Sequence, residues 1–430
     1  MSKHVIVISE DALVYEDTRT LRELPVFGSI WHRVARVKRM RSIYPSVTYP
    51  CHTSMMTGCY PDRHGIVNNE LSRLGESASP WHWFYDAVKA PSIFDAAKEK
   101  GLKTAAVFWP VTGNCPSIDY LIDEYWPQTP QESMRDCFLH SGSSPEVVEK
   151  CVDPHLWMQV NRTHPHCDAF ITACACSIIR EFKPHLLMIH PANVDAYRHE
   201  TGLFSPKVTH GLHEIDDWLG WILKATRDAG IEEDTDFFIV SDHGQIPIDR
   251  VMHPNVELAR RGLITLDNSG RMTDYVAIVK SAGASAQVYV KREADIERVG
   301  QLLEEMRAEG LYGFSRVYTA QEAWEEERLS GGFAFVLETD GYTSFGNDYT
   351  GALCRPHDIS DYRFGRATHG HQPDKGPQPT FIAFGPDIRP GALLERRPIV
   401  DEPATFARVL GVDMGEIDGR PMVELLRDGI

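Results

Sequence analysis

The chain has 430 residues and a mass of 48.5 kDa, and 42% of its residues are hydrophobic. This length suggests two or three structural units, although large α/β enzymes also form a single core of this size. The formal net charge of −17 argues against a nucleic-acid coat and against an anionic membrane as partner, because both need clustered Lys and Arg. An anionic small-molecule substrate is not excluded, since a few carboxylates can hold cations.

The distribution of apolar residues and cysteines indicates in which cellular compartment the protein is expected. The first apolar run, Val5-Ile6-Val7-Ile8, is too short for a signal-peptide core, and no stretch reaches the roughly 18 apolar residues of a membrane span. The nine cysteines form no paired CxxC sets, which argues against a zinc ribbon and favours reduced thiols. We therefore expect a cytoplasmic protein, which would not use the glycosylation sequon at Asn161-Arg162-Thr163.

Continuous apolar runs alternate with helical patterns along the chain. The runs at 5–9, 103–108, 186–189, 237–240 and 381–384 predict strands buried on both faces, as in a parallel sheet. Helices are predicted at 92–100 and from 208 to the stop signal at Gly230. This order predicts an α/β fold with a doubly wound, mostly parallel sheet flanked by helices.

The sequence pattern of residues 249–366 differs from that of the rest of the chain. They contain an alternating, half-exposed strand at 286–290, a charged amphipathic helix at 294–309 and a further strand at 333–337. We predict an inserted α+β cap subdomain over 249–366, within a catalytic core formed by 1–248 and 367–430.

Polar side chains follow several of these runs, and in a doubly wound sheet the site lies beyond the carboxyl ends of the strands. Each candidate also has an ordinary structural explanation: Asp11 as a turn former, Thr48 as a helix cap, and Asp195 with His199 as a surface ion pair. Together, however, seven groups suffice for two ions of zinc, manganese or iron. These groups are Asp11, Thr48, Asp195, His199, Asp242, His243 and His369.

In this order the motifs resemble the alkaline phosphatase superfamily, in particular the type I phosphodiesterase/nucleotide pyrophosphatase family. The resemblance spans nearly the whole chain except the insertion. The matching segments are Asp11, Thr48-Tyr49-Pro50-Cys51-His52, Gly58 to Ile66 with Asn69, Trp109-Pro110, Asp195 with His199, Asp242-His243-Gly244, His369-Gly370, and the tail around Asp401 and Asp418.

The resemblance implies an alkaline phosphatase-like core and a role for each matching residue. One divalent metal ion would be surrounded by Asp11, Thr48, Asp242 and His243, and a second by Asp195, His199 and His369. Zn²⁺ is the first expectation for both ions, with Mn²⁺ or Fe as alternatives. Thr48 would be the nucleophile that forms a phosphothreonine. Asn69 and a backbone N–H near Thr48 would contact phosphate oxygens.

The chain departs from the family pattern at three positions. Ala12 replaces the usual glycine, Cys51 the usual asparagine, and His371 a common tyrosine. The last two bear on substrate contacts more than on metal binding. The sulfatase signature Cys-x-Pro-x-Arg is absent from 51–55, which argues against a sulfatase.

Several activities remain open. Small-molecule phosphodiesters are the first expected substrates. Phosphonates, as in the related phosphonoacetate hydrolases, are the second, and phosphomonoesters the third. A phosphomutase would usually carry serine as its nucleophile. A metal-binding pseudoenzyme is the non-catalytic alternative, against which the intact Thr48 and the seven ligands argue. The aromatic residues Trp81, Trp83, Phe84 and Tyr85 could line a pocket and stack a base, but a buried packing cluster is the favoured expectation.

Overall fold

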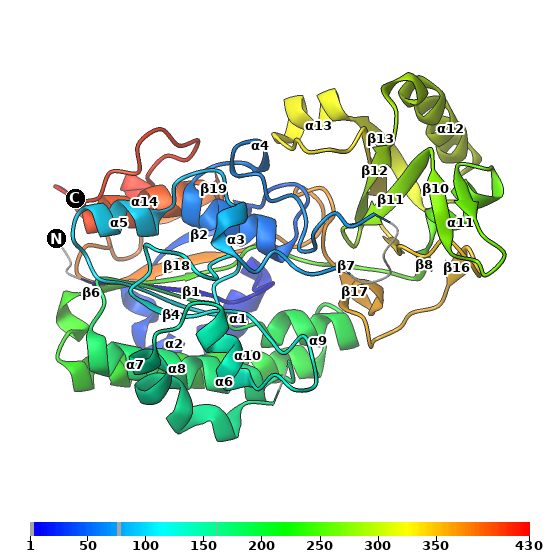
Figure 1. Cartoon of the computed structure of the whole chain (residues 1–430). Helices are drawn as coiled ribbons and strands as arrows, with labels where there is room; N and C mark the ends of the chain where they lie inside the picture. The colour runs from blue at the N-terminus through cyan, green and yellow to red at the C-terminus, as the bar shows by residue number, and fades with distance from the viewer. Residues whose placement is uncertain (1–3, 75–78, 161) are drawn as a thin grey trace.

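A computed structural model describes residues 4–74, 79–160 and 162–430, so Asn161 of the sequon lies outside the described residues. An eight-stranded sheet runs through the larger part of the molecule in the order β19-β2-β18-β6-β1-β5-β3-β4 (Figure 1). Five neighbouring strands, β6 to β4 in this order, run parallel. The strands are β1 (His4–Ser9), β2 (Ala35–Arg41), β3 (Thr104–Val107), β4 (Tyr120–Ile122), β5 (Leu186–Ile189), β6 (Thr235–Val240), β18 (Phe381–Phe384) and β19 (Leu393–Pro398).

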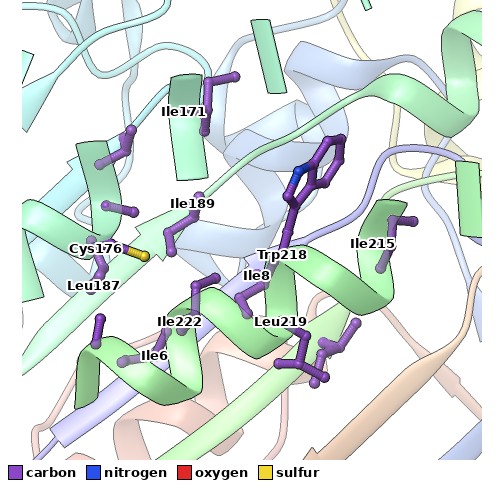
Figure 2. Packing of buried hydrophobic residues seen from close by; sticks show 14 of the residues in the cluster. Ile6, Ile8, Ile171, Cys176, Leu187, Ile189, Ile215, Trp218, Leu219 and Ile222 are labelled. Carbon is purple, nitrogen blue, oxygen red and sulfur yellow. The ribbon is translucent and has the colours of Figure 1, made fainter. Parts of the chain in front are cut away.

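The central strands are apolar throughout because both faces of the sheet are covered. Alternate residues of β1 enter different cores: Ile6 and Ile8 pack with α8 (His166–Phe182) and α10 (Pro206–Ala229), as Figure 2 shows. Val5 and Val7 pack on the opposite face, which is covered by α3 (Thr48–Thr57), α5 (Ile93–Glu99) and α14 (Asp401–Leu410) (Figure 1). The result is a three-layer α/β arrangement, which confirms the predicted fold class.

Two features of the sheet differ from the sequence expectation. The strand at 381–384 is present as β18, but it runs antiparallel to both of its neighbours. Strands β2 and β19 were not predicted, because their Lys and Arg residues break the apolar run. Strand β19 is the edge strand and β2 lies next to it, where alternate charged side chains keep contact with water.

The helix predictions are confirmed to within a few residues. Helix α10 begins after Ser205, whose side chain accepts a hydrogen bond from the Val208 amide, and ends at Gly230 with φ of 71°. Helix α5 begins with a capping box between Ser92 and Asp95. Glycine can end a helix in the left-handed conformation at little energetic cost, because it has no Cβ that would clash with the backbone.

The segment between β6 and β18 contains a separate antiparallel sheet, which lies to the right in Figure 1. Its order is β11-β12-β14-β13, and α12 (Ile296–Glu309) and α13 (Ala320–Glu327) accompany it. The strands are β11 (Ala277–Ser281), β12 (Ser285–Val290), β13 (Phe314–Thr319) and β14 (Phe335–Thr339). Strand β12 is buried along nearly its whole length, so the predicted half-exposed pattern was wrong. We call this part the cap.

Short elements connect the cap with the rest of the chain. Strands β7 (Ile246–Pro247) and β17 (Ala367–Thr368) pair at its root, and β8 (Arg250–Met252), β15 (Thr343–Phe345) and β16 (Cys354–Arg355) form a small sheet. Helix α11 (Pro254–Arg260) and the hairpin of β9 (Ile264–Leu266) and β10 (Met272–Tyr275) follow β8 in the chain. The 3₁₀ turn η8 (Tyr362–Phe364) precedes β17 in the chain.

Within the described ranges, none of the helices combines the length and apolar character that crossing a bilayer requires. All nine cysteines are free thiols, and Cys354 is the exposed one. The cytoplasmic location stays a prediction.

Candidate active site

A cavity of about 760 Å³ opens at the carboxyl ends of β1 and β5. Six of the eight predicted site residues line it: Asp11, Thr48, Asn69, Asp195, His199 and His369. The other two, Asp242 and His243, follow β6 and are fully buried directly behind Thr48 and Asp11. The structure therefore brings all eight residues together, although they are spread over more than 350 positions of the sequence.

The first group of potential ligands consists of Asp195, His199 and His369, whose ligand atoms all lie within 4.8 Å of one another. Helix α9 (Asn193–Thr201) places Asp195 and His199 one turn apart, as the spacing predicted. His199 Nδ1 donates to the Ala367 carbonyl at 2.7 Å, so in the neutral ring Nε2 carries a lone pair. That lone pair faces Asp195 Oδ2 at 3.1 Å, an arrangement that calls for a cation between them.

The second group consists of Asp11, Asp195 and His243. His243 Nε2 lies 3.5 Å from Asp11 Oδ1, 3.2 Å from Asp242 Oδ2 and 3.3 Å from Thr48 Oγ1. Asp195 belongs to both groups, whereas the sequence comparison assigned it to one metal only. Because Asp195 lies within reach of both groups, the two groups are adjacent, as two ions that act on one phosphate would need to be.

The electrostatics of these residues also favour bound cations. Burial, and then the neighbouring Asp195, raise the pKa of Asp11 well above its usual value, and burial and Asp11 do the same for Asp242. Burial lowers the pKa of His369 to about 3 and lowers that of His243 as well, so both rings are neutral near pH 7. Neutral imidazoles among crowded carboxylates are good ligands for a divalent ion, which removes the repulsion that raises the carboxylate pKa values.

Buried polar atoms without a hydrogen-bond partner also indicate that these residues suit bound cations. Among the buried atoms without a hydrogen-bond partner are Asp11 Oδ1, His199 Nε2 and Asp242 Oδ2. Leaving such groups buried and unpaired is costly, and each is a suitable ligand atom for zinc or a similar ion. The mixed carboxylate and imidazole set therefore fits two divalent cations.

Buried contacts hold these ligands in place from behind. Arg198, fully buried on α9, pairs with Asp17 and donates to the Ala12 carbonyl at 3.2 Å. This contact locks α9 to the turn that follows β1. Gln245 Nε2 donates to Asp195 Oδ1 at 2.5 Å and so orients that carboxylate.

Thr48 is the first residue of α3, with Val47 as the cap residue in an extended conformation. The Tyr49 amide donates to Asn69 Oδ1 at 2.9 Å, which directs the Asn69 side chain toward the start of the helix. Tyr49 N–H is therefore not available to a phosphate, and Pro50 has none. The Thr48 amide remains as the backbone donor of this turn, at the positive end of the helix.

Two further histidines near the site were not predicted. His190 Nε2 lies 3.1 Å from Asp11 Oδ2 and directly follows β5, a position that could have identified it. His52 Nδ1 donates to the Thr48 carbonyl at 2.9 Å, and Ser9 Oγ lies 2.9 Å from its Nε2. His52 thus ties the helix that carries Thr48 to the end of β1.

The predicted aromatic cluster divides into two parts. Trp81 lines the cavity together with Tyr49, Trp126 and Tyr362, and its ring centroid lies 5.1 Å from that of Tyr49 and 5.3 Å from that of Trp126. Trp83, Phe84 and Tyr85 instead pack against the core, and of the described cavity-lining residues none comes from 83–85. The packing expectation holds for these three residues and was wrong for Trp81.

Comparisons with known proteins identify the family of the chain. Residues 5–362 match the family model for type I phosphodiesterase/nucleotide pyrophosphatase. The human ectonucleotide pyrophosphatase/phosphodiesterase family member 1 is 24% identical over 231 residues, 51% of this chain and 21% of the human protein. Venom phosphodiesterase 2 of Crotalus adamanteus is 23% identical over 230 residues, 50% of this chain and 23% of its own length. The chain thus spans about a fifth of the length of such curated relatives.

Solved structures show the same fold. The human ectonucleotide pyrophosphatase/phosphodiesterase 5 superposes with a TM-score of 0.68 at 18% identity, covering 99% of this chain and 100% of that one. An inactive threonine-to-alanine form of the murine protein, in complex with AMP, superposes with a TM-score of 0.66 at 18% identity over 99% of this chain and 100% of that one.

Proposed function

The chain belongs to the type I phosphodiesterase/nucleotide pyrophosphatase family, and from this premise we propose that it is a two-metal-dependent phosphodiesterase with Thr48 as its nucleophile. The observation that carries the proposal is the convergence of Thr48 Oγ1 with unpartnered carboxylate and imidazole atoms at one end of the cavity. Small-molecule diesters of the nucleotide type are the proposed substrates. The AMP bound to the murine relative supports this class.

The residues divide into two ligand sets. Asp11, Thr48, Asp242 and His243 would hold one cation, and Asp195, His199 and His369 the other, with Asp195 close enough to serve both. Zn²⁺ is the proposed ion, because tetrahedral nitrogen and oxygen ligands suit it. When bound, the ions supply Lewis acidity that lowers the pKa of attached oxygens and neutralises charge on the phosphate.

Thr48 Oγ1 gives up its proton to solvent and forms the new bond to phosphorus while the bond to the leaving oxygen breaks, and the leaving oxygen takes a proton from solvent. The Asn69 amide nitrogen and the Thr48 backbone N–H donate to phosphate oxygens as negative charge grows on them. Water then attacks the phosphorus of the phosphothreonine, the bond to Thr48 Oγ1 breaks, a phosphate monoester is released, and a proton restores the Thr48 hydroxyl. The threonine-to-alanine change in the inactive murine relative supports a threonine in this role.

A substrate panel on metal-loaded protein tests the proposal. It compares bis-p-nitrophenyl phosphate, a nucleotide p-nitrophenyl ester, p-nitrophenyl phosphate and phosphonoacetate. We expect the two diesters to be hydrolysed fastest. Thr48→Ala should lower kcat by at least about 10³-fold while both metals are retained, because the nucleophile is lost and the other ligands remain.

Thr209→Ala, at an exposed position of α10, is the matched control and should retain full activity. Rapid turnover by Thr48→Ala with two metals bound would rule out the nucleophile assignment. Exclusive turnover of phosphonoacetate would instead assign the chain to phosphonate hydrolysis.

A further inference from the structure

Asn69 lies on a segment without regular secondary structure, between α4 (Pro61–His64) and the bridge that pairs Glu70 with Trp81. A helix or strand would fix its position through a ladder of backbone hydrogen bonds. Here, within the described residues, only two backbone hydrogen bonds tie residues 69–71 to 80–82, from the His82 amide to the Asn69 carbonyl and from the Leu71 amide to the Pro80 carbonyl, both at 2.8 Å. Further contacts must fix the segment against the cavity, because a donor that is misplaced by about 1 Å loses much of its effect on a transition state.

The cap supplies further contacts from two adjacent strands. Gln287 Nε2 on β12 donates to the Val67 carbonyl at 2.7 Å, and Asn68 Nδ2 donates to the Ser281 carbonyl at 3.0 Å. The Tyr289 hydroxyl lies 2.9 Å from Ser72 Oγ. These contacts hold the segment on both sides of Asn69.

A buried ion pair reinforces them. Glu70, next to Asn69, pairs with Lys280 of β11, and the side chains are only 9% and 5% exposed. Arg363 of η8 lies 3.4 Å from the other carboxylate oxygen of Glu70. Removing one member of such a pair leaves an uncompensated buried charge, so the pair strongly favours one arrangement of the segment.

The turn between β11 and β12 reaches a proposed metal ligand as well. The Ala284 amide donates to the His369 carbonyl at 2.8 Å. A Cβ on Gly283 would lie 2.5 Å from the same carbonyl oxygen, so the two backbones approach as closely as glycine allows. One hairpin therefore contacts the segments that carry Asn69 and His369.

We propose that the β11–β12 hairpin acts as a clamp that places Asn69 against the phosphate, and that Gln287 is its main positioning residue. This inference rests on the proposed phosphodiesterase activity. The clamp comprises Lys280, Ser281, Gln287 and Tyr289, which bind the segment of Val67, Asn68, Glu70 and Ser72. It acts through Asn69 rather than on the substrate.

A double-mutant cycle tests the clamp. Gln287→Met keeps the length of the side chain but removes the donor to Val67, and it should lower kcat/KM for bis-p-nitrophenyl phosphate about 10-fold with two metals still bound. In an Asn69→Ala background the same change should have less than about a twofold effect, because the group it positions is gone. A merely structural defect would lower activity equally in both backgrounds.

Two further variants keep the test decisive. Tyr289→Phe removes only one hydroxyl, and should give a smaller fall with the same dependence on Asn69 even if Gln287→Met folds poorly. Gln321→Met, on the exposed face of α13, is the matched control and should leave kcat/KM unchanged.

The outcomes separate the two proposals. An active wild-type protein with unchanged or Asn69-independent rates in Gln287→Met and Tyr289→Phe would overturn the clamp alone. A metal-loaded wild-type protein without diesterase activity would overturn the proposed function on which the clamp rests.

Discussion

The two sides of the cavity are fixed in different ways. On the core side, the metal-ligand candidates stand at strand ends or on a helix, where backbone hydrogen bonds fix their positions. On the cap side, Asn69 stands on an irregular segment whose position depends on side-chain hydrogen bonds and a buried ion pair. On the proposed function, the core would therefore supply most of the metal ligands, while the cap would fix Asn69 and support the backbone of His369.

Asp195→Asn should have the largest effect, since this residue lies in both ligand groups of the core side. Losing one carboxylate charge from both sites should remove metal from each and lower kcat/KM by more than about 10³-fold. Elemental analysis together with turnover of bis-p-nitrophenyl phosphate checks this.

Asp217→Asn, at an exposed position on α10, is the matched control for the loss of one carboxylate. Retention of two metals per chain in Asp195→Asn would show that the ligand groups are separate. It would favour the original assignment of Asp195 to a single ion.

Glu70→Gln should have a smaller effect of a different kind, because it alters the cap side. It leaves Lys280 and Arg363 without their shared carboxylate, and we expect a loss of about 3 kcal/mol in the free energy of unfolding. Metal content should stay at the wild-type level, while kcat/KM falls by about tenfold through Asn69.

Chemical denaturation and elemental analysis on the same samples check this prediction. Glu325→Gln, exposed on α13, controls for the change of charge in the cap. If Glu70→Gln also released metal, the contrast between a metal-binding core and a positioning cap would be wrong.

The same contrast explains what the sequence could predict. The strands at 5–9, 186–189 and 237–240 are continuous apolar runs that end in polar residues, so both the sheet and the site at its edge could be predicted. The spacing of Asp195 and His199 fits one turn of a helix. These are local signals, and they describe the core side almost completely.

The remaining features depend on contacts between distant residues. Gln287 and Val67 are 220 positions apart, and neither residue belongs to a motif. The antiparallel direction of β18 depends on the path of the chain rather than on its four apolar residues. Strand β2 carries three Arg and one Lys among seven residues, which hides its period-2 pattern. Consequently the cap contacts and the edge of the sheet could not be predicted from the sequence.

Ala12→Gly should have the smallest effect, on the core side where the family usually has glycine. Ala12 is fully buried with φ of 56°, in the left-handed region, and its amide donates to Asp242 Oδ1 at 3.3 Å. Glycine would relieve about 1–2 kcal/mol of backbone strain. Glycine would also cost about 0.5–1 kcal/mol, because it raises the conformational entropy of the unfolded chain, so the free energy of unfolding should rise by about 0–1.5 kcal/mol.

Chemical denaturation of metal-loaded protein checks this, with activity expected to stay within about twofold of wild type. Ala97→Gly, buried at a helical position of α5, is the matched control and should lose about 1 kcal/mol or more. If Ala12→Gly lost as much, the Ala12 methyl group would contribute more through packing than its backbone strain costs. The turn after β1 would then depend on side-chain packing, as the Asn69 segment does, and the contrast between core and cap would be weaker there.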